Sequence, residues 1–171
     1  FEHIPDPELV KAFDASLTLY AEHGFNASTF TARVVASSLS DLGSAVTAAI
    51  GSLKGPLHGG ANEAVMEMLT EIGSPDRVRS WVLEAFALRR KIMGFGHRVY
   101  RLGDSRVPTM KLYRDRVAQA VGDSHWIAIS DIVEETVREQ KGIPANLDFP
   151  AGPTYALLGF DIPISTVTDS S

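Results

Sequence analysis

Apolar side chains recur along most of this chain at the three- and four-residue spacing that gathers them on one face of an α-helix. We therefore expect a first helix that opens at Asp6 and Pro7, and a second over about 26–38. The inward face of the first helix should hold Val10, Phe13, Leu17 and Tyr20. A third helix, 40–55, is rich in Gly, Ala and Ser on every side. Other helices could approach its backbone closely, so we expect it to be buried, with a partner subunit as one candidate neighbour.

Further helical segments follow a break near Gly55 to Leu57, the one plausible domain boundary. The helix over 61–72 should bury Ala61, Ala64, Val65, Met68, Leu69 and Ile72. Ser74 and Pro75 should cap the next helix, whose inward positions are Val78, Trp81, Val82, Ala85 and Leu88.

The last third of the chain continues this pattern. A helix over about 105–121 should bury Val107, Met110, Tyr113, Val117 and Val121. A helix over about 123–140 should bury Trp126, Ser130, Val133 and Val137. A short helix should follow Pro150. Because no segment outside the polar tail alternates with period two, the predicted fold class is all-α.

Composition adds limits to this picture. The 171 residues, 44% of them hydrophobic and 22% charged, are enough to bury a substantial core. No apolar run approaches the ~18 residues that a membrane span needs, and the N-terminus shows no signal-peptide pattern. Cysteine is absent, which removes disulfides and thiolate sites. We therefore expect a cytoplasmic protein with no membrane partner, and the start at Phe1 rather than Met suggests a piece of something longer.

Positive charge is concentrated in one segment. Residues 89–116 hold nine Lys or Arg against Asp104 and Asp115, a balance of +7 in a chain whose net charge is −5. Within the segment, GFGHRVYRLGDSR combines glycines, which let a ligand approach the backbone, with guanidinium groups that grip carboxylates or phosphates. Such a cluster in an acidic protein favours a small polyanion and argues against nucleic acid as a partner.

Three loops carry side chains suited to chemistry near neutral pH. In GPLHGGAN, His58 precedes a helix whose positive end would keep the ring neutral and able to polarise a carbonyl; capping that helix is the alternative. His97 accompanies Arg101 and Arg106, although a solvated basic turn would have the same sequence. In NLDFPAG, apolar neighbours would raise the pKa of Asp148 and make it a better base, unless it merely caps a helix.

The other histidines give no metal signature. His23 closes the first helix, where interaction with the helix dipole is the default role. No HxxxH or HxH pair occurs, so we expect no metal site. The chain has no P-loop, and GFGHRVYR does not join a strand to a helix as a dinucleotide fingerprint does.

Four motifs in register, YAEHGFNAST, GPLHGGANEAV, GFGHRVYR followed by DSR, and NLDF, resemble the citrate synthase family over roughly residues 9–162. FNASTFTARVV, NLDFPAG and LLGFDI look most like its 2-methylcitrate synthase and bacterial citrate synthase branch. The resemblance implies an all-α homodimer that condenses an acyl-CoA with oxaloacetate and uses no cofactor besides the CoA thioester substrate. It assigns 1–57 to the large, dimerisation domain, 58–160 to a mobile, CoA-binding small domain, and 161–171 to a return to the large domain or a disordered tail.

The resemblance also implies residue roles. Asp148 would remove the proton next to the thioester while His58 donates to the thioester oxygen, because so weak an acid needs its developing charge neutralised in the same step. His97 would polarise the ketone of oxaloacetate, and His23 and Arg106 would hold its carboxylates. These loops converge only when the two domains close, which also excludes water.

The CoA thioester would be held by Arg101, at a phosphate, and by the turn of Gly94, Phe95 and Gly96. Acetyl-CoA and propionyl-CoA both remain open as substrates, because one methylene changes binding by only ~1 to 3 kcal/mol. The Gly- and Ala-rich third helix corresponds to one that packs across the dimer interface of the family.

Family members carry further helices, and these supply more carboxylate-binding arginines, one of them from the partner subunit. The resemblance therefore implies that this chain is an incomplete portion of such an enzyme and inactive by itself. A helical module that binds CoA or another anion without catalysis is the alternative. Such a module would need no acid and base pair.

Overall fold

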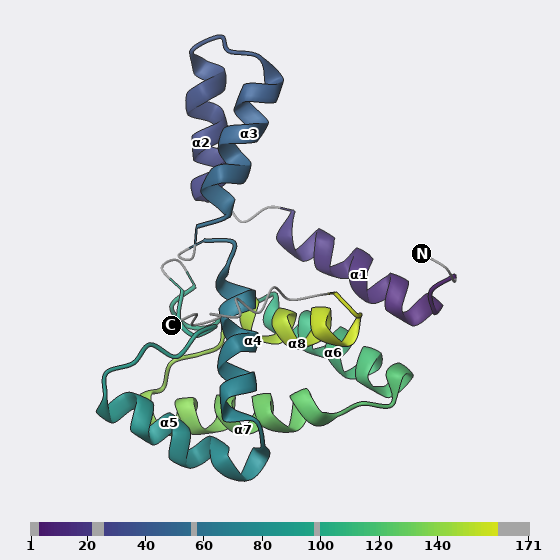
Figure 1. The fold of residues 1–171 in the computed structure, drawn as a ribbon, viewed down its shortest axis with the longest axis vertical. Coiled ribbons are helices and arrows are strands. Elements are labelled where there is room, and N and C mark those ends of the chain that lie inside the picture. Colours follow the sequence, from purple (N-terminus) through teal and green to yellow (C-terminus); the bar gives the residue numbers. More distant parts are fainter. Residues whose placement is uncertain (1–3, 22–25, 56–57, 98–99, 161–171) are drawn as a thin grey trace, which may run out of the picture.

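The computed structural model describes residues 4–21, 26–55, 58–97 and 100–160, and within these ranges the chain forms helices and no β-strand (Figure 1). The helices are α1 (Pro7–Tyr20), α2 (Ala27–Ser37), α3 (Leu42–Leu53), α4 (Ala61–Ile72), a 3-10 turn η1 (Pro75–Arg77), α5 (Val78–Ala87), α6 (Val107–Val121), α7 (His125–Lys141) and α8 (Asp148–Leu157). The predicted all-α class is confirmed. His23 and the tail from residue 161 lie outside the described residues.

Side-chain caps fix where the first three helices begin. Asp6 accepts a hydrogen bond from the Glu8 amide at 2.7 Å, directly before Pro7 at the first helical position. Asn26 accepts from Thr29 in α2, and Asp41 accepts from Ser44 in α3. These local signals explain why the sequence places these helices within one or two residues.

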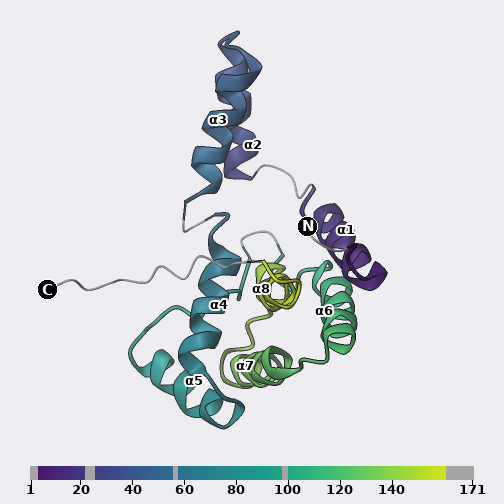
Figure 2. The same cartoon turned by 45° about the vertical axis from the view of Figure 1, so that its right-hand side comes forward.

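The hydrophobic core lies among α4, α5, α7 and α8 (Figures 1 and 2). Its fully buried members include Val65, Leu69, Ile72, Val78, Val82, Ile129, Val133, Val137 and Phe149. The predicted inward stripes of α4, α5 and α7 are therefore largely confirmed. Two positions at helix ends were predicted wrongly, because Leu88 is 64% and Val121 42% exposed.

Helix α1 docks through a different face from the one its apolar pattern predicts. Val10, Phe13 and Leu17 are exposed, whereas Ala12 and Ser16 are fully buried where α1 packs on α6. The hydroxyl of Tyr155 also reaches Ser16 Oγ at 3.1 Å. The small side chains let the helices approach closely, so Val10, Phe13 and Leu17 are left exposed, whereas Tyr20, the last residue of the predicted face, does pack inward as predicted.

Helices α2 and α3 form a hairpin that projects from the rest of the described chain (Figures 1 and 2). They pack on each other, and Ala45 is the one residue of the pair that is buried. The expectation of a buried α3 is therefore wrong for a single chain. Its apolar positions Val46, Ile50 and Leu53 are about half exposed.

Candidate active site

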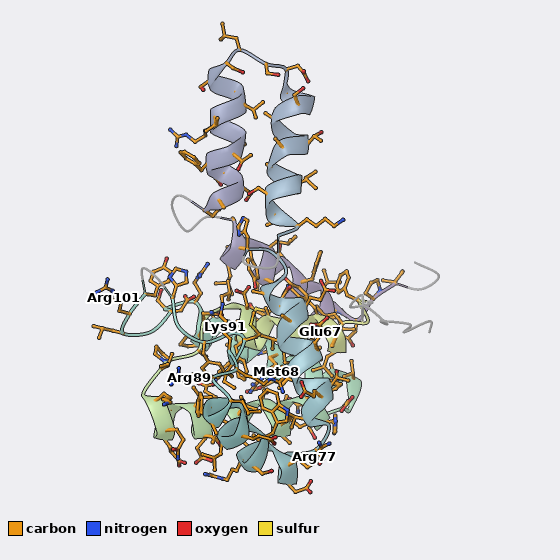
Figure 3. The ribbon with its side chains drawn as sticks, turned by 60° about the vertical axis from the view of Figure 1, so that its left-hand side comes forward. Glu67, Met68, Arg77, Arg89, Lys91 and Arg101 are labelled. Carbon is orange, nitrogen blue, oxygen red and sulfur yellow. The ribbon has the colours of Figure 1, made fainter. Side chains whose placement is uncertain are left out.

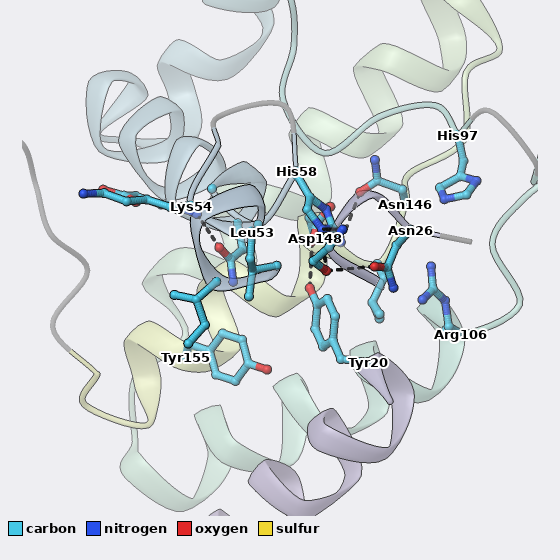
Figure 4. A pocket seen from close by; sticks show the side chains of 17 residues that line it. Tyr20, Asn26, Leu53, Lys54, His58, His97, Arg106, Asn146, Asp148 and Tyr155 are labelled. Carbon is cyan, nitrogen blue, oxygen red and sulfur yellow. Dashed lines mark hydrogen bonds between the residues drawn. The ribbon is translucent and has the colours of Figure 1, made fainter. Parts of the chain in front are cut away.

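A cavity of about 720 Å³ lies at the foot of the hairpin, where it meets the helical core (Figure 4). Its walls come from the end of α1, the start of α2, the end of α3, the turn before α4, and the loops before α6 and α8. Four predicted site residues line it: His58, His97, Arg106 and Asp148. The fold thus gathers side chains that are separated by up to 90 positions in the sequence.

Two segments beside this cavity, 94–97 and 144–148, are hydrogen-bonded to each other. The Asn146 amide donates to the Gly94 carbonyl and the Gly96 amide to the Pro144 carbonyl, both at 2.9 Å. The side-chain amide of Asn146 donates to the Gly96 carbonyl at 2.9 Å as well. This pairing fixes the loop that carries His97 against the loop that carries Asp148.

Gly94 has a packing role at this junction. Its φ is +79°, and a Cβ there would lie 2.7 Å from the Phe149 Cβ and 2.8 Å from the Val65 Cγ2. The Phe95 ring packs on Phe149 with centroids 4.5 Å apart. The predicted CoA contacts of Gly94, Phe95 and Gly96 stay predictions, because these contacts are all within the protein.

Asp148 is the first residue of α8, and its side chain points toward Tyr20 (Figure 4). The Tyr20 hydroxyl donates to Asp148 Oδ1 at 2.8 Å. Burial raises the pKa of Asp148, and it outweighs the hydrogen bond from Tyr20 and the positive charge of Arg106, which lower it. The predicted rise is confirmed. The capping alternative does not describe this residue, since the cap position falls on Leu147.

Tyr20 stays a hydrogen-bond donor across the ordinary pH range. Its pKa lies well above the usual value of a phenol, first because it is buried and then because the Asp148 carboxylate is adjacent. Tyr20 comes from α1 and Asp148 from α8, so the bond joins two helices at the cavity wall.

His58 meets the N-terminus of α2. Its Nε2 accepts the Ser28 amide at 3.2 Å and lies 2.9 Å from Ser28 Oγ. A ring nitrogen that accepts carries no proton, so the neutral imidazole has its donor at Nδ1. Helix α4 is capped at Gly60 without any side-chain hydrogen bond, so His58 does not take the alternative capping role.

His97 and Arg106 flank the other side of the cavity. His97 Nδ1 accepts the Tyr100 amide at 3.2 Å, which leaves the proton of the neutral ring on Nε2. The guanidinium of Arg106 lies over the Tyr100 ring, 5.3 Å from its centroid. The Arg106 side chain is only 14% exposed, so the solvated-turn reading is wrong for it.

Arg101 lies apart from this group, exposed and projecting from its loop (Figure 3). It lines a second cavity of about 430 Å³, together with Arg138 and the segment 142–145. Asp104 lines that second cavity too, while its ion-pair partner Arg106 lines the first.

The basic segment 89–116 is partly neutralised by its folding. Its paired cations are Arg90 with Glu71, Arg106 with Asp104, Lys111 with Glu134, and Arg114 with Asp115 and Asp131. Arg89, Lys91 and Arg101 are exposed (Figure 3). The net positive balance of the segment therefore overstates the charge that it offers to a ligand.

Sequence reasoning missed three residues of this site: Tyr20, Asp104 and Asn146. Tyr20 was assigned to an apolar face, and Asp104 was counted only as a charge. Asn146 stands directly before the LDF triplet, and its side-chain oxygen accepts the Asp148 amide at 3.1 Å. Only their place in the sequence could have indicated Asp104 and Asn146, because each lies two residues from a predicted site residue.

No three His, Asp or Glu side chains among the described residues come close enough together to hold a metal ion. No helix in the described ranges is both long and apolar enough to cross a membrane.

Comparison with known proteins gives consistent matches. The family described as citrate synthase, C-terminal domain, matches residues 1–169. The chain is 56% identical over 162 residues to 2-methylcitrate synthase of Mycobacterium tuberculosis, covering 95% of this chain and 41% of that protein. It is 54% identical to citrate synthase of Mycolicibacterium smegmatis, covering 95% of this chain and 43% of that one. The chain thus spans about two fifths of the length of the curated relatives it matches.

A solved structure shows the same fold. It is the ternary complex of carboxymethyl coenzyme A and oxaloacetate with citrate synthase from Thermoplasma acidophilum. The TM-score is 0.87 at 35% sequence identity, with 95% of this chain and 44% of that chain covered.

Proposed function

The chain belongs to the citrate synthase family, and we propose that it provides the acid, the base and part of the anion clamp of an enzyme that condenses an acyl-CoA with oxaloacetate. The product would be 2-methylcitrate or citrate, with release of CoA. The observation that carries this proposal is the convergence of His58, His97, Arg106 and Asp148 on one cavity.

The first step is removal of a proton from the carbon next to the thioester. That proton passes to the Asp148 carboxylate while the Nδ1–H of His58 donates a hydrogen bond to the thioester oxygen, which stabilises the negative charge that develops there. The raised pKa of Asp148 suits it to this task, because a more basic carboxylate is a stronger proton acceptor. The Ser28 amide holds His58 in the tautomer that donates from Nδ1.

The deprotonated carbon then forms a bond with the ketone carbon of oxaloacetate. His97 Nε2 donates to the ketone oxygen as it gains charge, and Arg106 binds a carboxylate of the same molecule. The second and third anion contacts would come from His23 and from arginines elsewhere in the enzyme. Water finally hydrolyses the new thioester, which releases CoA.

The second cavity suits the phosphate-bearing part of the CoA. Arg101 and Arg138 both line it, and the two carboxylates in its lining, Asp104 and Glu134, are paired with Arg106 and Lys111. The cavity adjoins the segment 142–145, which is paired with the 94–97 loop. Two guanidinium groups at one opening would attract phosphate groups. We therefore assign the two substrates to two neighbouring cavities.

The α2–α3 hairpin is the surface that we assign to a second copy of the chain. Phe30, Val34, Val46 and Ile50 leave their apolar side chains about half exposed on it. An apolar groove of about 370 Å³ runs between the two helices. Small residues on α3 allow a partner helix to approach closely, as expected for a homodimer.

The test is release of free thiol by the full-length protein from oxaloacetate with either acetyl-CoA or propionyl-CoA. We expect turnover with at least one of the two, and the ratio of kcat/KM values identifies the preferred acyl group. Binding of CoA without any thiol release would instead support the non-catalytic module.

A further inference from the structure

Asp104 is a buried carboxylate to which sequence reasoning assigned no role. Its side chain is 1% exposed. Its oxygens accept four hydrogen bonds from the residues around it. Three come from Arg106, through the backbone amide at 3.1 Å, Nε at 2.9 Å and NH2 at 2.7 Å. The fourth comes from the Leu147 amide at 3.2 Å.

These bonds connect two elements that both line the main cavity. Arg106 stands at the start of α6, and Leu147 immediately precedes Asp148 at the start of α8. They are 41 positions apart in the chain, and one carboxylate fixes both. A shift of Asp104 would therefore move the anion-binding guanidinium and the base together.

The pairing also decides which part of Arg106 can meet a substrate. Asp104 occupies Nε and one edge of NH2, and NH1 makes a long 3.4 Å contact with the Leu19 carbonyl. The NH1 and NH2 end of the guanidinium is thus the part that is left to receive a carboxylate. Arg106 is held in this orientation before any ligand arrives, which reduces the entropy lost on binding.

Asp104 is ionised at neutral pH. Burial alone would raise its pKa, but the hydrogen bonds and charge of Arg106 and the Leu147 amide outweigh burial and hold the pKa below its usual value. Because taking both charges out of water offsets much of their attraction, a buried ion pair adds little net stability, and the hydrogen bonds of this pair fix the orientation of Arg106.

We propose that Asp104 is a positioning residue of the condensation site, which orients Arg106 toward oxaloacetate and sets the base-bearing turn at Leu147 in register with it. This inference rests on the proposed function. It adds a residue that acts through Arg106 and Asp148, because the Asp104 side chain is only 1% exposed although the residue lies in the wall of the second cavity.

The test compares Asp104→Asn with wild type in the full-length protein. Asparagine keeps the shape but removes the charge that holds the guanidinium, so we expect the KM for oxaloacetate to rise about 10- to 100-fold. The KM for the acyl-CoA should change less than threefold. Asp115→Asn is the control for loss of a carboxylate that pairs with an arginine, since Asp115 pairs with Arg114, is 56% exposed and lines neither cavity.

A double-mutant cycle separates positioning from a general loss of stability. If Asp104 acts on oxaloacetate through Arg106, Asp104→Asn should change the oxaloacetate KM less than threefold in an Arg106→Leu background. An unchanged KM in Asp104→Asn, or an equal effect in both backgrounds, would overturn the proposal. Thermal unfolding of each variant shows whether it is folded.

Two further arms keep the outcome interpretable. Asp104→Glu retains the charge on a longer side chain, so its KM for oxaloacetate should lie between those of wild type and Asp104→Asn. If the asparagine variant does not fold, a wild-type KM for oxaloacetate in Asp104→Glu would overturn the proposal. Calorimetric titration with oxaloacetate measures the same effect as a binding constant. If wild type releases no thiol, the proposed function fails, while the titration still decides the role of Asp104.

Discussion

At the scale of single residues, the contact between Tyr20 and Asp148 carries a prediction about pH. The phenol donates to the carboxylate at 2.8 Å, and this bond lowers the pKa of Asp148 against the stronger effect of burial. The other groups that influence this pKa are Arg106 and His97, which lower it, and Asp104, which raises it. Tyr155 also lines the cavity beside Asp148.

We expect Tyr20→Phe to raise the pKa of Asp148, because the ionised form loses a donor while the site stays buried. The base must be deprotonated to act, so the acidic limb of the kcat/KM profile should move to higher pH. The measurement is a pH profile of thiol release for both proteins. If the acidic limb stays in place or moves to lower pH, the hydrogen bond from Tyr20 does not lower the pKa of the catalytic base.

The two arginines of the basic loop should serve different substrates. Arg106→Leu should weaken the binding of oxaloacetate, and Arg101→Leu should weaken the binding of the CoA thioester. Each loss should be about 1.5 to 3 kcal/mol of binding free energy, for one lost charge-assisted contact. The structure supports the division, because the two side chains line separate cavities. Separate titrations of the two ligands measure it, and equal weakening of one ligand by both substitutions would contradict it.

At the scale of elements, the close approach of α4 and α8 positions the base. Gly152 in α8 is buried, and a Cβ at this residue would lie 2.9 Å from the Asn62 carbonyl and 3.2 Å from the Met66 Cγ. Because a backbone carbonyl cannot rotate away as a flexible side chain can, the helices would have to separate.

We therefore expect Gly152→Ala to lower the free energy of unfolding by about 1 to 3 kcal/mol, the usual cost of overpacking. Gly51→Ala in α3 is the control, since no atom lies within 4 Å of its added methyl group. At a dilution at which the 171-residue chain is monomeric, this control should be neutral or slightly stabilising. Denaturant unfolding of both variants measures the difference, and an equally stable Gly152→Ala would show that the two helices are not closely packed.

Helix positions were predictable from the sequence because they depend on local signals such as Asp6, Asn26 and Asp41. The buried faces of α4 and α7 were predictable too, since each has apolar residues on the side that meets the core. The face of α1 was not predictable, because Ala12 and Ser16 are buried by helix contacts that the hydrophobicity of these residues does not indicate.

The residues of the candidate site also fall into those that the sequence predicts and those that it does not. His58, His97, Arg106 and Asp148 stand out by residue type and motif, so sequence reasoning found them. The contact of Tyr20 with Asp148 joins residues 128 positions apart, and that of Asp104 with Leu147 joins residues 43 positions apart. Nothing in the local sequence specifies such pairs, which arise only when helices from distant parts of the chain pack together.

At the scale of the whole molecule, the citrate synthase resemblance and the fold are confirmed by the family match and by the Thermoplasma acidophilum structure. The chain corresponds to 41% of the Mycobacterium tuberculosis relative. The proposed site draws anion contacts from outside these 171 residues, and the α2–α3 hairpin exposes apolar side chains.

We therefore expect the 171-residue chain, produced alone, to release no thiol from either acyl-CoA and to self-associate through the exposed apolar surface. Any retained CoA binding should weaken with added salt, because exposed charges are screened. Light scattering and the thiol assay measure the two properties. Robust turnover by the isolated chain would show that the site is complete within it.

The central claim is that Asp148 is the base of a condensing site. Its most direct test is thiol release by Asp148→Asn in the full-length protein, with oxaloacetate binding measured alongside. Asparagine preserves the shape of the side chain but cannot accept the proton, so turnover should fall at least ~100-fold while oxaloacetate binds nearly as in wild type. Near-normal turnover by this variant would contradict the account.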